Sequence, residues 1–103
     1  MKSIILRADK ARNLRYSTNA FCKMEEMTGK PVTQLAENAG MSDLRVMLFC
    51  GLYWEDNDLT EEKAGDIMDI VMQNHGIDEL TDKISKAMEL AMGEKKVLGK
   101  KKR

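Results

Sequence analysis

The sequence predicts a single α+β domain that is predominantly α-helical, in which an N-terminal β-hairpin precedes about five helices. Segments rich in β-branched residues occur near the N-terminus, whereas later apolar residues recur three or four positions apart, between glycines and capping residues. A chain of 103 residues suits one domain, and its apolar share of 43% is ordinary for a globular protein. We expect residues 1–93 to form this domain and residues 94–103 to form a flexible, disordered basic tail.

Two short segments near the N-terminus predict the strands of the hairpin. Ser3–Leu6 is apolar and β-branched, and Asn13–Tyr16 shows an alternating pattern. The polar connection Ala8–Ala11 lacks the Asn-Gly pair of a tight turn. Because two strands are only marginally stable alone, we expect the hairpin to pack on the helices or to pair with another chain.

Capping residues and glycines predict the bounds of the first two helices. Ser17 or Thr18 can cap the first helix, and Gly29 suits the left-handed position after its end. The apolar stripe of this helix is Phe21, Met24 and Met27. Pro31 suits the first turn of a short second helix, which Gly40 would close.

The third predicted helix is apolar on nearly every side. Ser42 is its expected N-cap, and Asp43 places a carboxylate in the first turn, where it favours the helix dipole. The apolar residues of this helix are Leu44, Val46, Met47, Leu48, Phe49, Cys50, Leu52, Tyr53 and Trp54. A helix of this kind is buried in a core or covered by a partner.

The last two predicted helices are amphipathic. Thr60 is expected to cap the fourth helix, which ends at His75 and Gly76. Its apolar stripe is Ala64, Ile67, Met68, Val71 and Met72. The fifth helix is expected to run from about Asp78 to Met92. Its stripe is Leu80, Ile84, Ala87, Met88, Ala91 and Met92.

The charges are unevenly distributed along a chain whose formal net charge is zero. Residues 94–103 hold six basic side chains and one carboxylate, a net charge of +5, so the remainder of the chain carries −5. A dedicated nucleic-acid-binding domain has a basic folded surface, and this tail has no aromatic residue for base stacking. Nucleic acid is therefore an unfavoured partner, although a basic tail can contact phosphates nonspecifically.

No segment has the character of a membrane span or a secretory signal. The longest run without a polar side chain, Val46–Trp54, is far shorter than the roughly 20 residues that a membrane helix needs. Arg7 ends the first apolar run soon after it begins. We expect a cytoplasmic protein without a membrane partner, in which Cys22 and Cys50 are buried thiols in a reducing compartment.

No arrangement of residues indicates catalysis or a cofactor. The single histidine, His75, lies at a helix end, and one histidine with two separated cysteines gives no zinc spacing. Asp56–Asp58 begins like a calcium loop, but Glu61 stands at its sixth position, where such loops require glycine. We therefore expect a binding protein that is not an enzyme and that holds neither a metal nor a cofactor.

Candidate partner-binding residues lie at the end of the third predicted helix and on the fifth. Nine methionines are many for this length, and methionine is an adaptable side chain in cores and at protein-binding surfaces alike. Tyrosine and tryptophan are enriched at interfaces. The candidates are Phe49, Tyr53, Trp54, Met88 and Met92. The pattern leaves open whether these side chains form core or an exposed groove.

Three segments resemble motifs of one protein family in both order and spacing. Leu14–Lys30 is similar to the L-R-[FY]-x-x-N-A-x-x-x-[LM]-E-E-x-T-G-K segment of tail assembly chaperones, which come from long-tailed bacteriophages, prophages and gene transfer agents. Leu44–Leu52 resembles the family's L-R-x-x-[LVM]-x-x-G-L, and Leu59–Ile67 resembles its L-T-x-E-x-[AV]-G-x-[IL]-[IL]. The family often has a glycine-containing hairpin turn where this chain has Arg7–Ala11, so the resemblance does not predict the strand register.

The resemblance implies a non-enzymatic protein of phage tail morphogenesis. It implies that the chain coats the long tape measure protein, helps to recruit tail tube protein in the host cell cytoplasm, and is absent from the mature virion. A homo-oligomer is also expected, because many copies would best cover a repetitive client. Two alternatives stay open. One is a small phage or bacterial regulator that contacts nucleic acid through its basic tail, and the other is a structural head or tail component.

Overall fold

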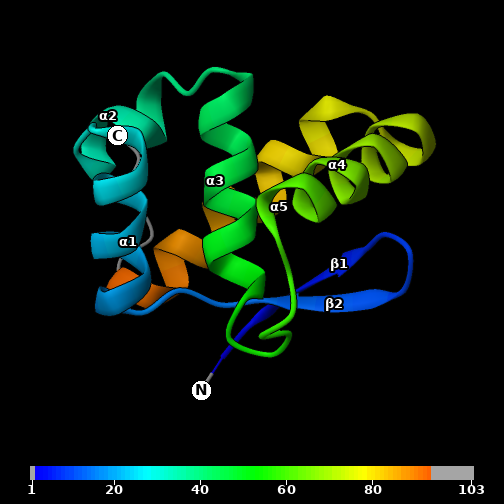
Figure 1. Cartoon of the computed structure of the whole chain (residues 1–103), viewed down its shortest axis with the longest axis horizontal. Coiled ribbons are helices and arrows are strands. Elements are labelled where there is room, and N and C mark those ends of the chain that lie inside the picture. Colours follow the sequence, from blue (N-terminus) through cyan, green and yellow to red (C-terminus); the bar gives the residue numbers. More distant parts are fainter. Residues whose placement is uncertain (1, 94–103) are drawn as a thin grey trace.

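The fold is α+β and mainly helical, with a two-stranded hairpin followed by five helices, as the sequence predicts (Figure 1). A computed structural model describes residues 2–93, and the predicted basic tail, residues 94–103, lies outside the described residues. The elements are β1 (Ile4–Arg7), β2 (Ala11–Leu14), α1 (Thr18–Thr28), α2 (Val32–Glu37), α3 (Met41–Leu52), α4 (Glu61–His75) and α5 (Ile77–Met92).

The hairpin forms, but its second strand begins two residues earlier than the expected Asn13–Tyr16. β1 and β2 are antiparallel, and the pairing of Arg7 with Ala11 leaves a three-residue turn between them. The strand ends early because the Arg15 amide donates to the Gly51 carbonyl oxygen of α3, at 3.0 Å, and is therefore taken by the core helix. Contact with α3 thus decides where β2 stops.

α3 lies at the centre of the molecule, which is one of the two alternatives that its apolar sequence leaves open. It stands between α1 and α4 in Figure 1, and it also packs against β2 and α5. Leu48 and Leu52 of this helix are fully buried, as are Leu6 and Leu14 of the two strands. The hairpin and the helices therefore share one hydrophobic core, in which burial supplies the main stabilising free energy.

The caps predicted for α1 and α4 are confirmed. The Ser17 hydroxyl accepts a hydrogen bond from the amide of Ala20 at 3.2 Å, and the Thr60 hydroxyl accepts one from Lys63 at 3.1 Å. Gly29 follows α1 in the left-handed conformation, with φ of 72°. Each residue satisfies a helix end that the helix itself leaves unpaired.

The bounds predicted between the second and third helices are wrong. α2 ends at Glu37 instead of Gly40, and Gly40 is the N-cap of α3 in place of Ser42. The Asp43 carboxylate accepts hydrogen bonds from the Gly40 amide at 2.9 Å and from the Lys30 ammonium at 2.7 Å. This side chain provides the capping that the sequence pattern attributes to Ser42.

The end of α3 also differs from the expectation. The helix stops at Leu52, so Tyr53 and Trp54 begin the turn toward α4 instead of completing a helical turn. A turn hydrogen bond from the Asp56 amide to the Tyr53 carbonyl oxygen, at 3.2 Å, replaces the helical pattern. α5 begins at Ile77, one residue earlier than expected.

The observed burial of the cysteines and methionines differs in part from the predicted core. Cys50 is buried as expected, but Cys22 is exposed, because Met24 faces the core from α1 and two residues correspond to about 200° around a helix. The buried methionines are Met24, Met47, Met68 and Met88, whereas Met41 and Met92 are exposed. Among residues 2–93, no helix is long and apolar enough to cross a membrane.

Candidate functional site

An open hollow of about 370 Å³ lies between α1 and the C-terminal part of α3. Its lining residues are Ser17, Asn19, Ala20, Lys23, Phe49, Cys50, Tyr53 and Trp54. We call this feature the aromatic hollow. One wall is formed by three of the five residues that the sequence nominated for partner binding, and the other wall is the first two turns of α1.

The aromatic side chains of the hollow are held in place although they are exposed. Tyr53 is 43% exposed and Trp54 is 41% exposed. The Phe49 and Tyr53 rings pack at 5.4 Å between centroids, tilted by 46°. The Trp54 indole N–H donates to the Asn13 carbonyl oxygen at 2.9 Å, and the Arg15 guanidinium lies 4.6 Å from the ring centroid. The rings therefore form a preorganised apolar surface.

A buried tyrosine supports this wall from inside. The Tyr16 ring stacks on Phe21 with 5.5 Å between centroids, and its hydroxyl donates to the Met47 carbonyl oxygen at 2.6 Å. Burial raises the pKa of Tyr16 well above its ordinary value, so it remains a neutral hydrogen-bond donor. The two helices that line the hollow are thus joined through one rigid side chain.

The side chains of the hollow are suited to binding a ligand and not to nucleophilic catalysis. Cys50 is its nucleophilic candidate, but burial raises the pKa of this thiol to about 11. A thiol of this kind is protonated at neutral pH and is a poor nucleophile. Lys23 and Asn19 give the rim a positive charge and an amide. This arrangement suits a ligand with an apolar surface, next to which a hydrogen-bond acceptor or a carboxylate of the same ligand could contact Asn19 or Lys23.

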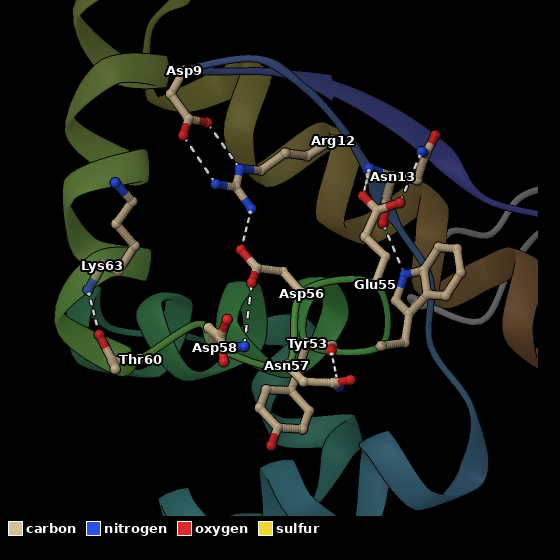
Figure 2. Close-up of polar contacts among 11 residues, drawn as sticks. Asp9, Arg12, Asn13, Tyr53, Glu55, Asp56, Asn57, Asp58, Thr60 and Lys63 are labelled. Atoms are coloured by element: carbon tan, nitrogen blue, oxygen red, sulfur yellow. Dashed lines mark hydrogen bonds and ion pairs between the residues drawn. The ribbon is translucent and has the colours of Figure 1, made fainter.

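The loop after α3 is pinned to the hairpin by a polar network (Figure 2). The Arg12 guanidinium donates to Asp9 at 2.8 and 2.9 Å and to Asp56 at 3.1 Å. The Asn13 amide and side chain donate to the Glu55 carboxylate at 2.8 and 3.1 Å. The loop that carries Trp54 therefore cannot move independently of the strands.

This network also explains the acidic residues that resemble the start of a calcium loop. Asp56 accepts from Arg12 with one oxygen and from the Asp58 amide, at 3.2 Å, with the other. The Asn57 side-chain nitrogen (Nδ2) donates to the Tyr53 carbonyl oxygen at 3.0 Å. The side chains of Asp56 and Asn57 therefore hold the turn together and join it to β2.

The other two nominated residues lie away from the hollow. Met88 is only 1% exposed and belongs to the core, beside a smaller cavity of about 230 Å³ between α2, α3 and α5. Met92 is exposed at the end of α5. The sequence reasoning missed Asn19 and Lys23, whose i, i+4 spacing places them on one face of α1 and was an available signal.

Comparisons of the chain with protein-family models, curated proteins and solved structures found no match. Within residues 2–93, no group of three His, Cys, Asp or Glu side chains is placed to hold a metal ion. The function proposed below therefore depends on the geometry of the hollow and on the resemblance described above.

Proposed function

We propose that this chain is a tail assembly chaperone that binds the tape measure protein without catalysing a reaction. The observation that carries the proposal is the aromatic hollow, in which Tyr53 and Trp54 are exposed yet fixed in position. Exposed aromatic residues held in one geometry bind at a low entropic cost, because few rotamers are lost on association.

The occupant that suits this hollow is an amphipathic helix of the tape measure protein. Large apolar side chains three or four residues apart on such a helix would contact the Phe49, Tyr53 and Trp54 rings, as in other helix-in-groove complexes. A carboxylate on the flank of the same helix would pair with Lys23 at the rim. Coverage of the apolar face would keep the client from aggregating until tail tube protein assembles around it.

The experiment that tests the proposal is co-expression with the tape measure protein, followed by a solubility assay and measurement of binding. We expect Trp54→Ala and Tyr53→Ala each to weaken binding by about tenfold, because each removes a large interface side chain. Ile77→Ala is the matched control, since Ile77 is a comparably exposed apolar residue outside the hollow. Its effect should stay within about twofold.

Three results would contradict the proposal in different ways. A folded chain that neither binds the tape measure protein nor keeps it soluble removes the chaperone function. Detection of the chain in purified virions by mass spectrometry favours a structural component. Salt-sensitive nucleic-acid binding that is lost when residues 95–103 are deleted favours the regulator.

A further inference from the structure

A second groove lies between the first half of α3 and α4, on a different face from the aromatic hollow. Its volume is about 460 Å³. Its lining residues are Met41, Ser42, Arg45, Glu62, Gly65, Asp66, Met68 and Asp69. We call it the acidic groove. Neither the hollow nor the polar network of the loop uses any of these residues.

The acidic groove has an uncovered apolar part. Met41, at the start of α3, is 58% exposed, more than any other large apolar side chain of residues 2–93. Met68 also belongs to the lining, although only 3% of it is exposed, so Met41 supplies most of this apolar surface. Gly65 has no side chain, and a Cβ added there would lie 3.3 Å from Cδ of Arg45, so the Arg45 side chain lies close against the backbone of α4. The groove therefore offers apolar surface at one end.

The rim of the acidic groove carries unpaired negative charge. Glu62, Asp66 and Asp69 follow the i, i+4, i+7 spacing of one helix face, and no ion pair among residues 2–93 involves them. Arg45, the basic residue of the lining, pairs with Glu61 outside the groove, with 3.9 Å between Nη2 and Oε1. Like charges three or four residues apart on a helix repel one another, so a cationic ligand would relieve a local repulsion.

We propose that the acidic groove binds residues 94–103 of a second copy of this chain. That segment contains Val97 and Leu98 between two groups of basic residues. Its composition complements the groove in both respects, because the apolar pair matches Met41 and the flanking cations match the carboxylate rim. The same complementarity holds for the whole chain, whose last ten residues carry +5 and whose remainder carries −5.

The position at which the body ends favours a second copy over the chain's own segment. The last turns of α5 lie on the side of α1, whereas α4 lies on the other side of α3 (Figure 1). Ten residues span at most about 35 Å when fully extended. The longest dimension of the molecule is 36 Å, so a crossing from the side of α1 to α4 would extend its own segment across the body, at a cost in conformational freedom that the segment of a second copy avoids.

The proposed contact joins two different surfaces, so each copy offers one groove and one basic segment. Such a heterologous contact propagates from copy to copy, as a ring or as a filament. The inference does not rest on the proposed chaperone function, because the aromatic hollow takes no part in it. The two proposals can therefore fail separately.

The test is sedimentation velocity of the full chain over a range of concentrations. We expect the wild-type chain to self-associate, and the triple variant Glu62→Lys/Asp66→Lys/Asp69→Lys to self-associate at least tenfold more weakly. The control Glu26→Lys/Glu37→Lys/Glu89→Lys changes the net charge equally outside the groove and should retain association. A wild-type chain that stays monomeric, or equal effects of the two triple variants, would overturn the proposal.

A charge exchange between copies tests the identity of the occupant. The variant Lys95→Glu/Lys96→Glu/Lys100→Glu/Lys101→Glu should not associate with itself, because its segment and its groove are both acidic. Mixed with the groove variant, it should form complexes again, since each contact then joins opposite charges. Absence of association in the mixture would show that the groove does not take the basic segment of another copy.

Discussion

Gly51 and Tyr16 show at the level of single residues how the central helix accommodates the hairpin. A Cβ at Gly51 would lie 2.7 Å from Cζ of Tyr16 and 2.9 Å from Cδ2 of Leu14. Both neighbours are buried and belong to the segment that crosses α3. The glycine is therefore required by the close approach of that segment, and a glycine inside a helix otherwise weakens it.

We expect Gly51→Ala to lower the free energy of unfolding by about 1–3 kcal/mol, because the added methyl group overpacks a rigid site. Gly65→Ala is the control within another helix. Its Cβ would meet only the flexible Arg45 side chain, so alanine's helix propensity should make the change neutral or stabilising by up to about 1 kcal/mol. Urea denaturation measures both, and equal losses would refute the role assigned to Tyr16.

Asp9 makes stability depend on acid pH. The hydrogen bond from the Arg12 guanidinium holds the pKa of the Asp9 carboxyl at about 2, below its ordinary value of 3.8. Arg12 is only 3% exposed but the Asp9 side chain is 28% exposed, so solvent screens this ion pair in part and reduces its contribution to stability. A carboxyl with a lower pKa in the folded state contributes stability above pH 3.8, and that contribution is lost as the pH falls through about 2.

We expect Asp9→Asn to cost about 1–2 kcal/mol at pH 7. The difference from the wild type should shrink between pH 4 and pH 2 and vanish below about pH 2, where the wild-type carboxyl is also neutral. Asp82→Asn is the control, because the Asp82–Lys86 pair is exposed and should contribute less than about 0.5 kcal/mol. A difference independent of pH would contradict the role of the Asp9 charge.

At the level of elements, α3 depends on a carboxylate that also fixes the preceding connection. Asp43 joins the amide of the N-cap residue, Gly40, to Lys30, which follows α1. We expect Asp43→Ala to cost about 2 kcal/mol, as loss of a cap together with a charged hydrogen bond. Ser42→Ala should change stability by less than about 0.5 kcal/mol, since Ser42 is exposed and does not cap the helix. Thermal denaturation of both variants distinguishes the two roles, and the reverse order would restore Ser42 as the cap.

The end of β2 was predicted wrongly because it depends on a distant contact, unlike the features that were predicted correctly. The amphipathic stripes, Ser17, Thr60 and Gly29 depend on contacts within a few residues, and the sequence predicted each of them. The end of β2 depends on a hydrogen bond to Gly51, which is distant in the chain. Local patterns carry no information on such a partner, so this bound could not be predicted, whereas the N-cap of α3 depends on the local contact of Asp43 with Gly40.

At the scale of the whole molecule, two surfaces with different chemistry lie on either side of α3. The aromatic hollow offers apolar rings, whereas the acidic groove offers carboxylates. We expect an increase in salt from about 50 mM to about 500 mM to weaken self-association by at least tenfold and binding of the tape measure protein by less than about threefold, because salt screens charges and leaves apolar contacts intact. Sedimentation velocity and pull-down at both salt concentrations measure the two effects. Equal sensitivity would contradict the assignment of a charged contact to the acidic groove and an apolar contact to the aromatic hollow.

The sequence by itself determined the class of fold, the order of the elements and the apolar character of the third helix, and it nominated Phe49, Tyr53 and Trp54, which line the hollow. These follow from periodicity and from side-chain type, which are local properties. The tertiary structure alone decided that Met88 is core, that Cys22 is exposed and that α1 supplies the second wall of the hollow. Burial and enclosure depend on which faces of distant segments meet, and that is set by the packing of the whole chain.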